Sequence, residues 1–167
     1  MNYVVRLGSL AFAVLAAGCA TSEVSTSPSG SSISIVRLRS EPYSFTFVSG
    51  FNEPARLMVR DPATWQAVWV QTFRGASPLP PLPDIDFSRE MVVVVALGSH
   101  SSGGYGILIE GASEAGADGV ELAIHSISPG PKCGVTGAFT QPVDIARMPR
   151  RDGAVRFVER NEVTHCE

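Results

Sequence analysis

Residues 89–110 read REMVVVVALGSHSSGGYGILIE, and this stretch decides the fold. From Met91 to Leu97 the residues are apolar and mostly β-branched, which is typical of a short strand buried on both faces. Serine and glycine dominate after Gly98, and apolar residues then return with a period of two from Tyr105 to Ile109. The pattern predicts two strands joined as a hairpin by an exposed loop, with the first strand at the centre of the core.

The composition of the chain indicates a single globular domain. It has 167 residues, of which 44% are hydrophobic and 17% charged, enough for one well-buried core. The formal net charge of −3 argues against a nucleic-acid partner, because neutralising a phosphate backbone requires a concentrated basic surface.

The N-terminus has the pattern of an export signal. Arg6 precedes an apolar run from Leu7 to Ala17, and small residues lead to Cys19. This resembles a bacterial lipoprotein signal, which implies removal of residues 1–18 and acylation of Cys19 by fatty acids such as palmitate. Several acyl chains on one residue anchor a protein stably to a membrane. An ordinary cleaved signal or an uncleaved anchor are the alternatives.

Residues 19–32 indicate the destination membrane and the link between the anchor and the domain. Ala20 follows the cysteine in place of the aspartate that often retains lipoproteins at the inner membrane, so we expect an outer-membrane protein facing the periplasm or the surface. Residues 19–32 are mainly serine, threonine and glycine, and they predict a flexible tether. The single globular domain is then expected over residues 33–167.

The number of cysteines is consistent with lipidation. The chain has three, and if Cys19 carries lipid, Cys133 and Cys166 remain as a pair in an oxidising compartment. A disulfide closing this loop of about 34 residues would stabilise the fold by roughly 3 to 4 kcal/mol. Two free buried thiols are the alternative.

One amphipathic helix is predicted after residue 61. Asp61 is suited to the N-cap, Pro62 to the first helical position, and Gly75 to the position beyond the end. The residues that repeat at helical spacing form one apolar stripe, namely Trp65, Val68, Trp69, Thr72 and Phe73. We expect this stripe to pack on a sheet, although a tryptophan pair could also stack on a sugar. The proline-rich residues 77–87 predict a stiff connector to the central strand.

The other segments predict further strands. Tyr43 to Phe47 alternates aromatic and polar residues, and Val120, Leu122 and Ile124 share one face with His125 on the other. Residues 142–148 and 154–160 are expected to form a hairpin, with Val143 and Ile145 opposite Val155 and Phe157. The fold class is therefore α+β and β-rich, an antiparallel, sandwich-like core with one helix packed on it.

Five arginines lie on or beside the second predicted hairpin, with acidic residues between them: Arg147, Arg150, Arg151, Arg156 and Arg160. A solvated and salt-paired sheet edge is the simpler interpretation. Contact of this arginine cluster, which includes Arg150 and Arg151, with an acidic partner or with anionic lipid is the alternative.

No catalytic, cofactor or metal site is predicted. His100 stands beside Ser101 and Ser102, but adjacency alone does not orient a base toward a nucleophile. The chain lacks the GxSxG, HExxH and CxxC patterns, and His125 and His165 lie far from His100 in the sequence. We therefore expect a protein that is not an enzyme.

The order of several short motifs resembles the C-terminal domain of the PrcB family, named for an accessory lipoprotein of a surface protease complex. The motifs are SGF, VRDPATWQAVW, PLPDIDF, VVVVALG, SGGYGILIE and PVDIARMPR, spread over about residues 49–150. The resemblance implies a noncatalytic subunit that stabilises or assembles an envelope protein, with a protease as one candidate partner.

Two other functions remain open. A protease inhibitor could insert the loop formed by His100, Ser101, Ser102, Gly103, Gly104 and Tyr105, because a rigid hairpin loses little entropy on binding. A lipoprotein that binds cell-wall glycan is the third possibility. A scaffold would instead dock another envelope protein through an exposed sheet edge or through the hairpin from Arg147 to Arg160. The expected partner-binding residues are therefore the six loop residues together with Arg150 and Arg151.

Overall fold

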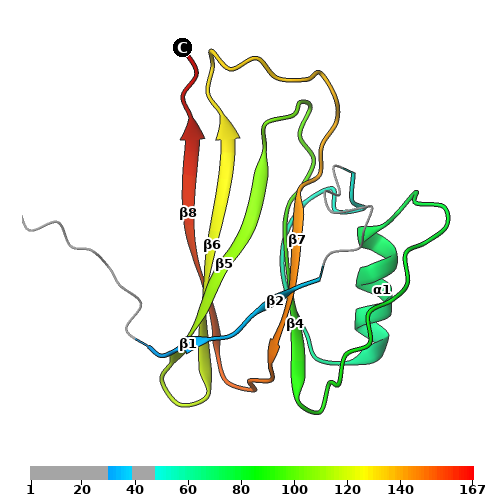
Figure 1. Ribbon diagram of the computed structural model, residues 1–167, viewed down its shortest axis with the longest axis vertical. Helices are drawn as coiled ribbons and strands as arrows, with labels where there is room; N and C mark the ends of the chain where they lie inside the picture. Colours follow the sequence, from blue (N-terminus) through cyan, green and yellow to red (C-terminus); the bar gives the residue numbers. More distant parts are fainter. Residues whose placement is uncertain (1–29, 39–47) are drawn as a thin grey trace, which may run out of the picture.

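The computed structural model describes residues 30–38 and 48–167 and shows two β-sheets and one helix (Figure 1). The predicted anchor Cys19 and the predicted strand from Tyr43 to Phe47 lie outside these residues. The elements are β1 (Ser32–Ile33), β2 (Val36–Arg37), β3 (Pro54–Val59), α1 (Pro62–Thr72), β4 (Glu90–Leu97), β5 (Gly106–Ala115), β6 (Gly119–Pro129), β7 (Val143–Pro149) and β8 (Val155–Thr164).

The strands form two four-stranded sheets. The outer sheet has the order β1-β5-β6-β8, and the central sheet has the order β2-β7-β4-β3. All neighbours are antiparallel except β6 and β8, which are parallel. Figure 1 shows α1 on the side of the central sheet that faces away from the outer sheet. The β-rich sandwich with one helix is therefore confirmed.

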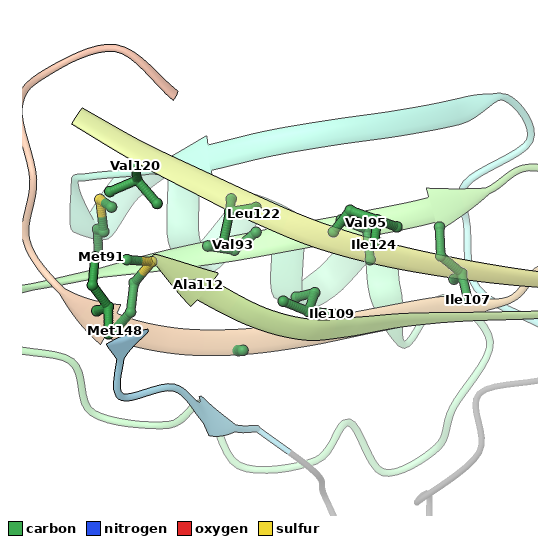
Figure 2. Close-up of a cluster of buried hydrophobic side chains, with 12 residues drawn as sticks. Met91, Val93, Val95, Ile107, Ile109, Ala112, Val120, Leu122, Ile124 and Met148 are labelled. Carbon is green, nitrogen blue, oxygen red and sulfur yellow. The ribbon is translucent and has the colours of Figure 1, made fainter. Parts of the chain in front are cut away.

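Strand β4 is buried on both faces, as its uninterrupted apolar sequence predicts. Met91, Val93 and Val95 face the outer sheet, and their side chains meet those of β5 and β6 (Figure 2). Val92 and Val94 face the helix. Each of these five side chains is fully buried, so β4 is the layer that both cores share.

The helix packs as predicted. The carboxylate of Asp61 accepts a hydrogen bond from the backbone N–H of Thr64 at 2.9 Å, and the apolar stripe from Trp65 to Phe73 lies against the central sheet. The helix ends at Thr72, and Gly75 follows in the left-handed region at φ 93°.

The proline-rich connector covers the helix and supplies hydrogen-bond acceptors. The indole N–H of Trp65 donates to the carbonyl of Pro83, and that of Trp69 donates to the carbonyl of Pro80, each at 3.0 Å. Buried indoles need such partners, because an unpaired N–H in the core is costly. The two tryptophans are only 2% and 1% exposed, which leaves no face for a sugar.

Both predicted hairpins are wrong. Strand β4 pairs with β3 and β7, whereas β5 pairs with β1 and β6, so residues 98–105 cross from the central sheet to the outer sheet. Likewise β7 and β8 lie in different sheets, and β8 runs parallel to β6. The predicted faces of β8 are right, since Val155 and Phe157 pack on the core between the sheets. Ile145 instead faces the helix.

Candidate functional site

Two connections cross between the sheets at the same end of the sandwich. Residues 98–105 lead from β4 to β5, and residues 130–141 lead back from β6 to β7. Figure 1 shows both connections at the end where the C-terminus also lies. We call these two segments the loop end. The predicted partner-binding loop from His100 to Tyr105 is part of it.

Glycine sets the path of the first segment at its two turns. Gly98 has φ 83° and Gly104 has φ 90°, a region that other residues rarely adopt. A Cβ atom on Gly98 would stand 3.0 Å from the carbonyl oxygen of Asn52. The glycines therefore have a structural role in turning the chain toward the outer sheet.

The two segments are hydrogen-bonded to each other along their length. The backbones of His100 and Thr140 exchange two hydrogen bonds of 2.8 and 3.0 Å. The N–H of Gly103 donates to the carbonyl of Thr136 at 2.9 Å, and the hydroxyl of Thr140 donates to the carbonyl of Ser102 at 2.7 Å. The predicted exposed hairpin tip is thus a partly covered segment whose backbone is already engaged.

Two of the predicted side chains form a stacked pair. The rings of His100 and Tyr105 have their centroids 3.8 Å apart and are inclined by 13°. Burial lowers the pKa of His100, because a desolvated imidazole binds a proton less readily. Its Nε2 atom has no hydrogen-bond partner within the described ranges, so that nitrogen does not orient Ser101 or Ser102.

The second segment carries the exposed apolar side chains of the loop end. Phe139 is 70% exposed and Val135 is 43% exposed. The segment is held at its start by the Cys133–Cys166 disulfide, whose Cα atoms are 5.0 Å apart. The predicted disulfide is therefore present. Val135 and Phe139 are not among the partner-binding residues predicted from the sequence. The sequence signal for them is that they are apolar residues set among glycine and threonine in residues 134–140.

Arg150 and Arg151 lie at the opposite end of the sandwich from the His100–Tyr105 stack. The N–H of Arg150 donates to the carbonyl of Arg89, which precedes β4, whereas His100 follows it. Arg150 also donates to the carbonyl of Phe87 and contacts Asp152 at 3.0 Å. The structure thus does not bring the two groups of predicted partner-binding residues together.

The remaining arginines form ion pairs, as the simpler interpretation predicts. Arg160 lies 2.8 Å from Glu110 and 3.0 Å from Glu162, and the hydrogen bond that its guanidinium donates to the Glu110 carboxylate raises the pKa of Arg160. His125 lies between the same two carboxylates on the outer face of the sheet, with ring nitrogens 3.3 and 3.0 Å from them. Arg156 pairs with Glu121.

Neither a cluster of metal ligands nor a membrane-spanning helix occurs among the described residues. Within residues 30–38 and 48–167, no three histidine, cysteine or acidic side chains gather as a metal site would require. The described helix is not long and apolar enough to cross a membrane. Asp86, Arg89, Glu90 and Pro149 line an open hollow at the end opposite the loop end.

One segment of the chain, which contains the loop end, matches a known protein family. Residues 91–149 match the PrcB C-terminal family model. This PrcB C-terminal segment runs from β4 to the end of β7, so it includes both crossings between the sheets. The resemblance noted in the sequence is therefore confirmed over these residues. No curated protein and no solved structure matches the chain.

The PrcB C-terminal match covers only part of the fold. It contains β4, β5, β6 and β7, whereas the helix and β8 lie outside it. The four strands inside it carry most of the buried residues of the core between the sheets, and every residue of the loop end also lies within the match. The part of the chain that resembles PrcB is thus the part that builds and presents the loop end.

Proposed function

We propose that the protein is a noncatalytic accessory lipoprotein, anchored through Cys19 to the outer membrane, that stabilises or assembles an envelope protein bound at the loop end. The match of residues 91–149 to the PrcB C-terminal family is the observation that carries this proposal. The resemblance implies a protease complex as the first partner to test.

The position of the N-terminal part of the fold favours a loop end that points away from the membrane anchor. The carbonyl of Ser31 accepts a hydrogen bond from the N–H of Glu114, and β1 pairs with Ser113 and Ala112, close to the turn between β5 and β6. The loop end lies at the other end of β5, roughly 20 Å away at the usual rise per residue of a strand. A tether attached before Ser31 therefore leaves the loop end directed away from its point of attachment.

The chemistry of the loop end suits a protein partner. Phe139 projects into solvent from a segment that a disulfide and several backbone hydrogen bonds hold in place. An exposed aromatic side chain on an ordered backbone binds with little loss of conformational entropy, and such residues often dominate interface energies. The stacked rings of His100 and Tyr105 belong to the same loop end.

The two other functions receive less support. An inhibitor that inserts an extended loop into a protease needs free backbone groups. Here the carbonyl of Ser102 accepts a hydrogen bond from Thr140, and the N–H of Gly103 donates one to Thr136. The tryptophan pair that could have stacked on a sugar, Trp65 and Trp69, is buried.

Site-specific photo-crosslinking in cells tests the proposed surface. A photoreactive amino acid placed at position 139 in the full chain should give a discrete adduct of higher mass with an envelope protein. Val70 is 50% exposed on the helix, so the same probe at position 70 is the matched control and should give none. The Phe139→Asp variant should lose the partner on co-purification, whereas Val70→Asp should retain it. Equal adducts at both positions would contradict the assignment.

Metabolic labelling tests the anchor separately. The full chain should incorporate labelled palmitate, and Cys19→Ser should abolish both the label and the sedimentation with membranes. Cys166→Ser is a control, because it removes a cysteine that lies in the disulfide. Unchanged labelling of Cys19→Ser would exclude lipidation at this residue.

A further inference from the structure

Among the residues that the structure describes, none pairs with the outer side of strand β8. It has ten residues, forms the edge of the outer sheet, and pairs only with β6 among the described elements. The register with β6 continues without a bulge from Val155 to Thr164, and the strand contains no proline. An open edge of this length can accept a further strand.

The hydrogen bonds to β6 show which backbone groups are free. The carbonyls of Ala154 and Thr164 accept hydrogen bonds from Val120 and Gly130, both at 2.9 Å. Because backbone groups alternate sides along a regular strand, the even-numbered residues of β8 face β6 and the odd-numbered residues face the open side. The residues with N–H and C=O groups directed to the open side are Val155, Phe157, Glu159, Asn161 and Val163.

The charged side chains of β8 are complementary to those of a second β8 strand that runs antiparallel to it. An antiparallel pair with its two-fold axis at Glu159 places Arg156 of each copy opposite Glu162 of the other copy. These are positions without direct hydrogen bonds, where opposing side chains are closest. Moving the axis by one residue, to Val158 or Arg160, instead sets arginine opposite arginine. An axis at Asn161 avoids that repulsion but shortens the paired stretch.

The exposed apolar side chains of β8 also gain partners in this register. Val163 is 47% exposed and lies opposite Val155 of the second copy. Val158 is 41% exposed and lies opposite the aliphatic part of Arg160. The two central Glu159 carboxylates are each neutralised within their own chain, because Arg56 donates two hydrogen bonds of 2.8 and 3.0 Å to Glu159.

We propose that two copies of this chain pair through antiparallel β8 strands, with the two-fold axis at Glu159, to form one continuous eight-stranded outer sheet. The alternating charges that discourage pairing with an arbitrary strand favour pairing with this one. None of the residues of the loop end belongs to the paired edge, so the dimer leaves the proposed partner surface free. A strand of a different protein on β8 is the competing outcome.

Co-purification of two differently tagged full-length copies from detergent-solubilised membranes tests this arrangement. The wild-type copies should purify together. Arg156→Glu alone sets glutamate against glutamate in both cross-strand pairs, and Glu162→Arg alone sets arginine against arginine. Each single variant should weaken self-association about tenfold, from the usual energies of cross-strand charge pairs.

Mixing the two single variants provides the decisive comparison. In a mixed dimer the Arg156→Glu copy presents two glutamates and the Glu162→Arg copy presents two arginines, so both cross-strand pairs become attractive again. Co-purification of the mixed pair should therefore return to near the wild-type level. This recovery does not occur if the variants act only by breaking contacts inside one chain, because those contacts stay broken.

Controls separate association from folding. Arg74→Glu makes the same charge change at an exposed residue near the helix end and should leave self-association unchanged. Formation of the Cys133–Cys166 disulfide, read on non-reducing gels, reports folding of each variant. Wild-type copies that do not co-purify would overturn the proposal, as would a mixed pair no stronger than the single variants. Capture of a different protein at β8 in place of the second copy would also overturn it.

Discussion

Asp144 in the central sheet accepts a hydrogen bond from the backbone N–H of Ile109 in the outer sheet, at 2.8 Å. The same carboxylate lies 3.2 Å from the guanidinium of Arg37, which also donates to the carbonyl of Ile109. The contact stands where the chain passes from β1 to β2 and where the register of β5 is interrupted. It therefore joins the two sheets on one side, while Arg56 and Glu159 join them on the other.

Removal of the Asp144 carboxylate should destabilise the protein strongly. Asp144→Ala leaves the N–H of Ile109 without its acceptor and Arg37 without its counter-charge, and we expect a loss of about 3 kcal/mol in the free energy of unfolding. Urea unfolding measures the change. Asp152→Ala is the matched control, because Asp152 is an exposed ion-pair partner and should cost less than about 1 kcal/mol. Equal losses for the two variants would contradict a buried tie between the sheets.

The hydrogen bond from Trp69 to the carbonyl of Pro80 predicts that two substitutions of Trp69 lower the free energy of unfolding by different amounts. Trp69→Phe keeps most of the apolar volume but removes the indole N–H and leaves the Pro80 carbonyl unpaired, which should cost about 1 to 2 kcal/mol. Trp69→Ala also opens a cavity and should cost about 3 to 5 kcal/mol. Chemical denaturation of both variants checks the order. A neutral effect of Trp69→Phe would show that the connector does not depend on this bond.

The disulfide should stabilise both the whole fold and the loop end. Replacing Cys133 and Cys166 together by serine releases a loop with a sequence separation of 33, and we expect the free energy of unfolding to fall by about 3 to 4 kcal/mol. Amide hydrogen exchange in residues 98–105 should also become faster, because the segment they bond to loses its constraint. Exchange that stays unchanged there would mean that the backbone hydrogen bonds alone hold the loop end.

Protonation of His100 should weaken the fold in acid. The pKa of His100 is below its ordinary value of 6.5, so the folded protein binds this proton less readily than the unfolded chain. Its contribution to stability is thus complete above about pH 6.5 and falls as the pH drops through the folded-state pKa. His100→Phe keeps a ring for Tyr105 but cannot be protonated. Urea unfolding at several pH values should show a smaller acid loss for this variant, and parallel profiles would contradict the prediction.

Much of the architecture could be predicted from local patterns in the sequence. The uninterrupted apolar residues from Met91 to Leu97 indicated a strand with two buried faces. The N-cap at Asp61 and the apolar stripe from Trp65 indicated the helix and its packing face. The pairing of Cys133 with Cys166 followed from the number of cysteines. Each of these inferences depends on residues close in sequence or on a simple count.

The partners of the strands and the make-up of the loop end depended on the tertiary structure. A period of two shows which side chains share a face, but it does not show which strand lies alongside, so two connections between sheets were mistaken for hairpins. The covering of residues 98–105 by residues 130–141, and the position of Arg150 at the opposite end, follow from those crossings. Burial is encoded in the pattern of each segment, whereas strand neighbours are selected by the packing of the whole chain.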